Sequence, residues 1–207
     1  MSTFNPERMM IMNKLSKKEQ RTDQILLSLK KLDFLNRTQL QTLHDLGSDR
    51  NARKVMQNLD EYVHYFRDGE KIYYLSKEGR ERVDCNKVRK KTIQAPHYIM
   101  RNYLYIAYGC PETWENEVLL EIEGQVKVVC DAIFEDGGSD HIIEIDHTQK
   151  MSVNKVKINK YRQLFSSGVY KTKPKLIWMT TTDYRRKQLL KLCEGLNVEV
   201  FTITDFY

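Results

Sequence analysis

The sequence predicts a two-domain α+β protein, with a mainly helical first domain and an α/β second domain built on a mixed sheet. Two observations predict this division. The order of elements changes from helices followed by a hairpin to strands alternating with helices, and the charge balance changes near the same place. With 207 residues, of which 41% are hydrophobic and 30% charged, the chain has the composition of a folded protein and the length to bury a core.

The charge is unevenly distributed between the two halves. Residues 1–100 contain 20 Lys or Arg and 13 Asp or Glu, whereas residues 101–207 contain 14 and 15. A basic half beside a near-neutral half suggests that the first half meets a polyanion. A lysine-rich solvated surface gives the same surplus, so the pattern of elements has to decide between the two.

The sequence also indicates the cellular compartment of the protein. No apolar run approaches the roughly 20 residues that span a bilayer, and the N-terminus has no pattern of a secretory signal. Cys85, Cys110, Cys130 and Cys193 lie far apart without a CxxC pair, which favours free thiols over a disulfide frame or a zinc site. We therefore expect a cytoplasmic protein without a membrane segment.

The first domain is predicted over residues 18–84, after an N-terminal extension of residues 1–17. Leucine and isoleucine residues at helical spacing predict a helix over 18–32. Asn36 then offers a cap for a short second helix that ends at Gly47.

A third helix is predicted over residues 50–62, capped by Ser48 or Asp49. Its outward positions carry hydrogen-bond donors suited to nucleic acid: Arg50, Asn51, Arg53, Lys54 and Gln57. Guanidinium and ammonium groups pair with phosphate or guanine, and carboxamides pair with adenine.

Two alternating aromatic runs flank Asp68-Gly69 and predict a β-hairpin that carries Arg67 and Lys71. Helix, helix, helix, hairpin, helix resembles the winged helix-turn-helix superfamily. In such domains the third helix enters the major groove of duplex DNA and the hairpin lies along the backbone or minor groove. Winged helices also serve as dimerisation or scaffold modules, which remains the alternative for this domain.

A basic linker is predicted over residues 85–96 and a second domain over 97–207. The domain reads as helix, three strands, helix, strand, helix, strand, which is αβββαβαβ with a mixed sheet. An acid, Asp131, lies late in the second strand, and Glu144 and Asp146 lie late in the third. This arrangement resembles the PD-(D/E)xK nuclease-like, or restriction-endonuclease-like, fold.

In that fold two carboxylates hold a divalent metal, and a lysine two residues after the second acid activates water. The resemblance implies a Mg²⁺ or Mn²⁺ site at Asp131, Glu144 and Asp146, but Asp146 occupies the lysine position. A scaffold that does not cleave is therefore favoured over an active nuclease. Lys150, Lys155, Lys157 or His147 could supply the missing cation.

Four C-terminal motifs resemble one architecture more closely: DAIF from Asp131, EIDHT from Glu144, KINKY from Lys157 and IWMTTTDYRRKQLL from Ile177. With the winged helix, they are similar to the replication-relaxation family of bacterial plasmids, phages and integrative elements, from about residue 18 to the end. The resemblance implies a link to replication control.

Together these features predict a DNA-binding regulator of transcription or replication that needs no cofactor to bind duplex DNA. The second domain would serve dimerisation, further DNA contacts or partner binding, and symmetric operators favour a homodimer. One alternative is a metal-dependent endonuclease or nickase that uses Asp131, Glu144 and Asp146. Another is an adaptor that docks on a host or element-encoded protein.

Overall fold

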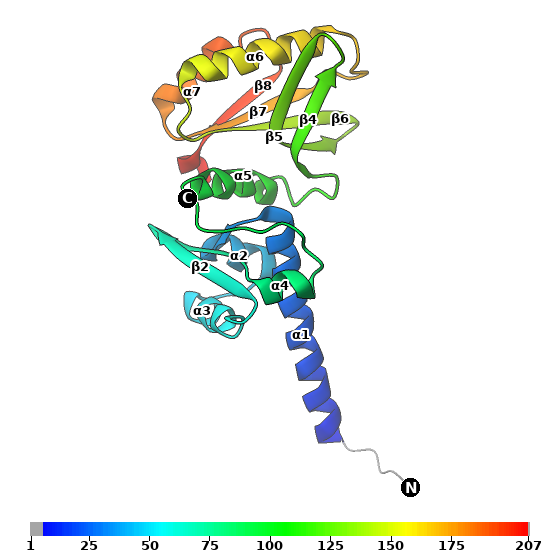
Figure 1. Cartoon of the computed structure of the whole chain (residues 1–207), viewed down its shortest axis with the longest axis vertical. Coiled ribbons are helices and arrows are strands. Elements are labelled where there is room, and N and C mark those ends of the chain that lie inside the picture. Colours follow the sequence, from blue (N-terminus) through cyan, green and yellow to red (C-terminus); the bar gives the residue numbers. More distant parts are fainter. Residues whose placement is uncertain (1–5, 207) are drawn as a thin grey trace. The chain divides into compact units, whose positions relative to one another are not determined.

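The computed structural model describes residues 6–206, with side chains from Leu15 onward, and this part contains seven α-helices and two β-sheets (Figure 1). The mixed α and β class expected from the sequence is confirmed. The chain divides into two units after Tyr98. Among the described residues, no helix combines the length and the apolar character that a membrane crossing requires.

The first unit follows the predicted order of helices and hairpin, with a long first helix that supplies much of the core. Ile25, Leu26 and Leu29 of this helix are buried. The elements of the unit are α1 (Pro6–Leu32), β1 (Leu35–Asn36), α2 (Arg37–His44), α3 (Asp49–Gln57), β2 (Val63–Asp68), β3 (Glu70–Leu75) and α4 (Lys77–Arg82). α1 begins at Pro6 rather than at the predicted residue 18, and proline suits the first turn of a helix.

The predicted helix caps are present in α2 and α3. The Oδ1 atom of Asn36 accepts from the backbone N–H of Gln39 at 2.8 Å, and the backbone N–H of Asn36 donates to the Gln39 side chain at 3.3 Å. Of the two candidates for the α3 cap, Ser48 is the residue used, since its Oγ accepts from the N–H of Asn51. These bonds satisfy backbone donors that a helix start leaves open.

The third helix ends at Gln57, before the predicted Tyr62. The Asn58 N–H is shared between two carbonyls of the preceding turn, and the N–H of Tyr62 returns to the carbonyl of Leu59. Asn and Asp side chains favour turns over helix interiors, and Asn58 and Asp60 both follow the helix. The helix is shorter than predicted, and a turn fills the residues between it and the hairpin, which begins at Val63 as the sequence indicates.

The hairpin is regular and has the predicted turn. β2 and β3 pair antiparallel from Val63↔Leu75 to Asp68↔Glu70, and Gly69 between them has φ +71°. β1, a two-residue strand too short to show alternation in the sequence, pairs with the other side of β3. One face of the hairpin packs on Phe34, and the other face is buried at Val63, Tyr73 and Leu75 and more open at Tyr65.

The second unit has the predicted order αβββαβαβ. Its elements are α5 (Ala95–Ala107, which begins in the first unit), β4 (Glu115–Ile122), β5 (Val126–Asp136), β6 (Ser139–Asp146), α6 (Met151–Ser166), β7 (Lys175–Thr180), α7 (Asp183–Leu192) and β8 (Val198–Thr202), followed by a 3-10 turn (Ile203–Phe206). The sheet has the order β4-β5-β6-β7-β8. β4, β5 and β6 are antiparallel neighbours, and β6, β7 and β8 are parallel, so the sheet is mixed.

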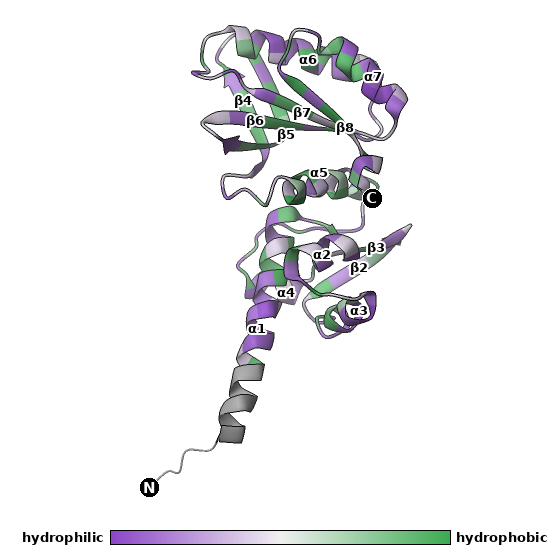
Figure 2. Ribbon diagram, turned by 180° about the vertical axis from the view of Figure 1, so that it is seen from behind, coloured by the Kyte–Doolittle hydropathy of each residue, from purple (hydrophilic) through white to green (hydrophobic). Residues whose placement is uncertain are grey.

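The larger sheet is covered on both faces. Trp178 and Tyr161 are fully buried in a hydrophobic cluster formed by the sheet with α6 and α7. The aromatic rings of Tyr108, Trp114 and Phe134 pack together on the other face. In Figure 2 the end of the β2–β3 hairpin is hydrophilic, whereas the strands of the larger sheet carry much of the hydrophobic colour.

Candidate functional site

A groove with a volume of about 1080 Å³ lies between α3 and the β2–β3 hairpin of the first unit. Four of its lining residues are cationic: Arg37, Arg53, Arg67 and Lys71. Its lining also includes Gln57, Tyr65 and Tyr73, and only two acidic residues, Asp60 and Glu70. We call this feature the α3–hairpin groove; its cations outnumber its acids, so it carries a surplus of positive charge.

The five side chains predicted on α3 do not share one environment. Arg53 and Gln57 line the groove, and Arg50 and Lys54 are exposed on the helix. The Nδ2 atom of Asn51 donates to the carbonyl of Leu46 at 2.7 Å, so this carboxamide helps to hold the turn between α2 and α3.

Arg67 and Lys71, the two residues predicted on the hairpin, lie directly opposite each other in the β2–β3 register. Like charges in this position repel and destabilise a strand pair. Among the side chains that the structure describes, neither forms an ion pair with a carboxylate, and the Lys71 Nζ atom lies 3.7 Å from the centre of the Tyr65 ring. The hairpin therefore presents two cations without a carboxylate partner in the described part of the chain.

Sequence reasoning did not single out three residues of the groove, Arg37, Tyr65 and Tyr73. Burial raises the pKa of the Tyr73 phenol, and nearby guanidinium groups, among them that of Arg37, oppose this shift. The sequence signal was available for the tyrosines: they alternate with Arg67 and Lys71 at the spacing of one strand face.

In the second unit, Asp131 lies where β5 and β6 separate. The paired residues of the two strands run from Ala132↔Ile143 to Asp136↔Ser139. Beyond this point the N–H of Ile145 donates to Asp131 Oδ2 at 2.7 Å instead of to a strand carbonyl. The carboxylate thus replaces a backbone acceptor at the fork between the strands.

Glu144 is fully buried on β6 and is held by two residues of α6. The Lys157 Nζ atom lies 2.5 Å from Glu144 Oε2, and the Tyr161 hydroxyl donates to Oε1. Burial and the Asp131 carboxylate raise the pKa of Glu144, and the two α6 partners oppose this shift. Burial lowers the pKa of Lys157, but the carboxylates of Glu144 and Asp131 raise it by more.

Lys157, one of the cations expected to approach from the following helix, therefore forms an ion pair with Glu144. Lys150 is the N-terminal cap residue of α6, and Lys155 is exposed on the helix.

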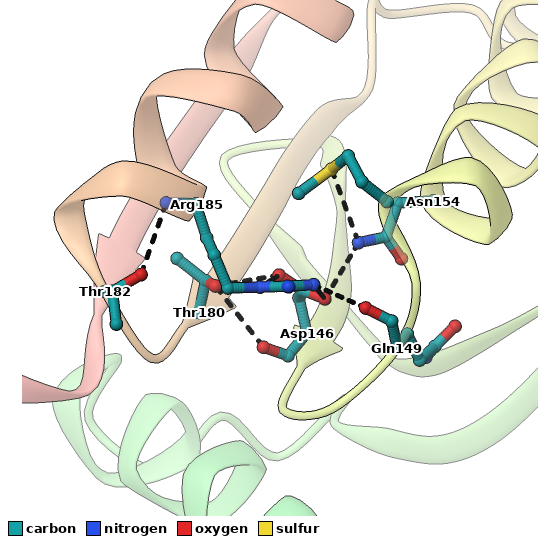
Figure 3. Close-up of polar contacts among 7 residues, drawn as sticks. Asp146, Gln149, Asn154, Thr180, Thr182 and Arg185 are labelled. Carbon is teal, nitrogen blue, oxygen red and sulfur yellow. Dashed lines mark hydrogen bonds and ion pairs between the residues drawn. The ribbon is translucent and has the colours of Figure 1, made fainter.

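Asp146 belongs to a separate and saturated network (Figure 3). Arg185 of α7 donates from Nε to Oδ2 at 2.7 Å and from Nη2 to Oδ1 at 2.6 Å. Asn154 of α6 and Thr180 of β7 donate to the same carboxylate. Burial alone raises the pKa of Asp146, but hydrogen bonds led by Arg185 lower it below its ordinary value.

The geometry does not bring the three predicted ligands together as one metal site. Asp146 is saturated by Arg185, Asn154 and Thr180, while Glu144 is bonded to a different set of partners. Across the described residues, no group of three or more His, Cys, Asp or Glu side chains is arranged to hold a metal ion. Asp146 in this arrangement does not fit a divalent cation.

Comparisons with known proteins give one clear result. No curated protein matches the chain. Two solved structures are similar at a low level: protein VC1899 from Vibrio cholerae (13% identity, TM-score 0.40, 87% of this chain and 52% of that one) and Can2 from Sulfobacillus thermosulfidooxidans in complex with cyclic tetra-adenylate (11%, 0.36, 90% and 48%). The chain spans about half the length of each, and at these TM-scores neither carries an argument about fold or activity.

The family model described as replication-relaxation matches residues 26–179, which include parts of both units. The match confirms the suspected family and covers the first three C-terminal motifs, and it ends within the fourth. Because it covers well over half of the sequence, the chain belongs to the replication-relaxation family.

Proposed function

We propose that this protein is a DNA-binding regulator of a mobile genetic element that controls transcription or replication and copy number. Its family suggests a role in the replication of mobile elements. The observation that carries the proposal is the α3–hairpin groove, which Arg53 of α3 lines and where the opposed pair Arg67 and Lys71 has no carboxylate ion-pair partner among the described side chains. A polyanion is the ligand that such a surface favours.

Residues 18–84 act in this proposal as a winged helix-turn-helix domain. The order α1, α2, α3, hairpin and α4 supports the assignment. α3 enters the major groove with Arg50, Arg53, Lys54 and Gln57 toward the bases and nearby phosphates, and Arg67 and Lys71 meet the backbone. Asn51 has one amide donor engaged in the chain, so we assign it a smaller share of base contacts than the sequence suggests.

The second domain, residues 97–207, follows a linker of residues 85–96 and acts as a nuclease-like scaffold. Its buried carboxylates are bonded to cations of the same unit, which supports a structural role for them. Such a scaffold supplies dimerisation, further DNA contacts or partner binding. We propose a homodimer, because two symmetric half-sites strengthen the modest contact of a single helix.

The test is binding of the purified protein to a labelled duplex from upstream of its own gene, measured by fluorescence anisotropy at two salt concentrations. We expect tight, salt-dependent binding, and Arg53→Ala weakens it by about 1–3 kcal/mol if Arg53 contacts a guanine. Lys77→Ala, which removes an exposed lysine of α4 outside the groove lining, is the matched control and leaves binding unchanged. Equal affinity of Arg53→Ala, Lys71→Ala and wild type would contradict the proposal.

A second candidate function, a metal-dependent DNA endonuclease or nickase, is favoured by one observation. Asp131 and Glu144 flank the strand fork, and Lys157 reaches Glu144 from α6, so two acids and a lysine lie near one another. For a metal to bind there, Lys157 would have to release Glu144. Incubation of supercoiled DNA with Mg²⁺ or Mn²⁺ and a denaturing gel test this: cleavage that disappears in Asp131→Ala supports the enzyme.

Intact DNA with salt-dependent binding supports the regulator, whereas absence of both binding and cleavage supports the adaptor that docks on a host or element-encoded protein.

A further inference from the structure

We propose that the α3–hairpin groove is a binding site for the sugar–phosphate backbone of a nucleic acid strand, and that Tyr65 is the positioning residue that holds Lys71 beside Arg67 in this site. The inference rests on the proposed function and deepens it. It assigns a role to Tyr65, which has neither a charge nor a base-reading group.

The arrangement follows from the strand register. Tyr65 and Arg67 on β2 pair with Tyr73 and Lys71 on β3, so all four side chains belong to the same face of the hairpin. The opposite face packs on Phe34 through Phe66 and is part of the core. The polar face is thus the one directed into the groove, whose lining contains all four of these residues.

Lys71 has an unusual partner for a cation in a strand pair. Its neighbour across the strands is Arg67, and their Cβ atoms are expected within about 5.5 Å of each other. A flexible lysine beside a guanidinium would ordinarily swing into solvent. The Lys71 Nζ atom instead lies 3.7 Å from the centre of the Tyr65 ring, a cation–π distance that holds the ammonium without adding a negative charge.

Because Lys71 contacts a ring and not a carboxylate, Lys71 and Arg67 together can bind an anion. An ion pair with an acid would cancel the charge of Lys71, whereas the Tyr65 ring fixes its position and leaves the charge intact. Two neighbouring cations, of which Lys71 is held in place by the ring, match the oxygens of a phosphodiester group. The Tyr65 side chain is also half exposed (52% for the residue), so its ring edge is open to the sugar that follows a bound phosphate.

The other wall of the groove supplies a cation from α3. Arg53 is largely exposed and lies 3.8 Å from Asp49, a distance at which it can exchange this partner for a phosphate. A strand lying in the groove thus meets Arg53 on one side and Arg67 with Lys71 on the other. In this arrangement α3 and the hairpin both contact the backbone of one strand.

The experiment compares Tyr65→Phe, Tyr65→Leu, Lys71→Ala and the double variant Tyr65→Leu/Lys71→Ala in the full chain. The affinity of each variant is measured for a labelled duplex, and separately for one of its single strands, at about 50 mM and about 200 mM salt. Lys71→Ala is expected to lower the salt slope by about 0.9, and Tyr65→Phe to keep the wild-type slope. Tyr65→Leu should reproduce most of the Lys71→Ala loss, and the double variant should bind no more weakly than Lys71→Ala.

Circular dichroism and thermal unfolding of each variant identify those that fail to fold. If Tyr65→Leu fails, Lys71→Gln and Arg67→Gln, which leave the ring in place, still report on the groove.

Additive losses in the double variant would overturn the positioning role of Tyr65. Unchanged binding of Lys71→Ala and Arg67→Ala, with loss in Arg50→Ala and Lys54→Ala, would overturn the groove but leave DNA binding by α3 intact. Unchanged binding of all these variants would overturn both. A slope change on Lys71→Ala of about 0.9 with duplex and about 0.7 with the single strand supports recognition of the backbone of one strand, and a slope change seen only with duplex would overturn it.

Discussion

The buried carboxylates of the second unit and the hairpin cations of the first unit are placed in opposite ways. In the second unit, Asp146 is fully buried and accepts hydrogen bonds from Arg185, Asn154 and Thr180, and Glu144 is equally buried against Lys157. In the first unit, the hairpin sets two cations side by side without a carboxylate partner among the described side chains. The difference separates charges that hold the fold from charges that are free to bind a ligand.

The physical reason is desolvation. A buried ion pair adds little net stability, because desolvation offsets the attraction between its charges. Breaking it is costly, because removal of one partner leaves the other charged group without water or counter-charge. An exposed cation remains hydrated, so its removal hardly changes stability and acts on ligand binding instead. Substitutions in the second unit should therefore report on unfolding, and substitutions in the groove should report on affinity.

The largest effect is expected from Arg185→Met. This change removes both bidentate bonds to Asp146, and it also removes the bond from Arg185 Nη2 to the carbonyl of Gln149 at 2.6 Å. Asp146 would remain buried with a carboxylate whose charge lacks its cation. We expect the free energy of unfolding to fall by about 3–5 kcal/mol, measured by urea denaturation followed by circular dichroism.

Two controls bracket this prediction. Lys187→Met removes an exposed cation from the same helix and should change stability by less than about 0.5 kcal/mol. The double variant Asp146→Asn/Arg185→Met should be more stable than Arg185→Met alone, since no charge remains buried without a partner. If Arg185→Met and Lys187→Met are equally stable, the Asp146 network does not hold the unit together.

A smaller, pH-dependent effect is expected from Lys157→Met. Unlike Asp146, Glu144 already has a raised pKa, because burial and Asp131 favour its protonated form, and Tyr161 still donates to it in the variant. Loss of the Lys157 ammonium raises this pKa further. Between the ordinary value of 4.5 and the raised value, the folded state holds a proton that the unfolded state has released, so stability falls as the pH rises through this window.

Lys157→Met should therefore lower the free energy of unfolding by about 1–3 kcal/mol near pH 8 and by clearly less near pH 5, as measured by urea titrations at both values. Lys155→Met, an exposed lysine of the same helix, is the matched control with no pH-dependent loss. The double variant Glu144→Gln/Lys157→Met should lose the difference between the two pH values. A loss of equal size at both pH values would show that Glu144 stays charged without Lys157.

Much of the fold was accessible from the sequence because its signals are local. Asn36 and Ser48 cap the helices they precede, the Asp-Gly turn forms the hairpin, and Trp178 is buried in its strand as its apolar neighbours indicate. Each of these depends on a few adjacent residues and on periodicity. The end of α3 was misplaced because the turn at Asn58 competes with an apolar pattern that continues beyond it.

The candidate sites were harder to predict because they depend on contacts between distant residues. Arg185, Arg186 and Lys187 are adjacent basic residues in the sequence, yet Arg185 binds the buried Asp146, Arg186 pairs with Asp183 and Asp205, and Lys187 is exposed. No local pattern distinguishes them. The same holds for Lys157, whose approach to Glu144 depends on how α6 packs on the sheet.

The smallest effect is expected from Asp49→Asn, which tests whether a carboxylate beside the groove weakens its cations. Asp49 is the acid that lies nearest the groove cations of α2 and α3: its Oδ2 atom is 2.8 Å from Arg37 Nη2 and 3.8 Å from Arg53 Nη2. In the free protein this carboxylate offsets part of the positive charge of Arg37 and Arg53, to which a phosphate would otherwise bind. Asp49→Asn should therefore strengthen DNA binding and steepen its salt dependence by up to about 0.9 in slope, as measured by anisotropy.

The stability of Asp49→Asn should fall by no more than about 1 kcal/mol, because the ion pair is exposed and the change removes only a favourable charge at the start of α3. Glu81→Gln makes the same change in net charge on α4, where the acid pairs with Lys77 away from the groove lining. A gain in affinity that Glu81→Gln does not share would mean that the two guanidinium groups were released, since net charge alone acts equally in both variants. Weaker binding by Asp49→Asn would assign the carboxylate the opposite role, that of holding Arg37 and Arg53 in position for the strand.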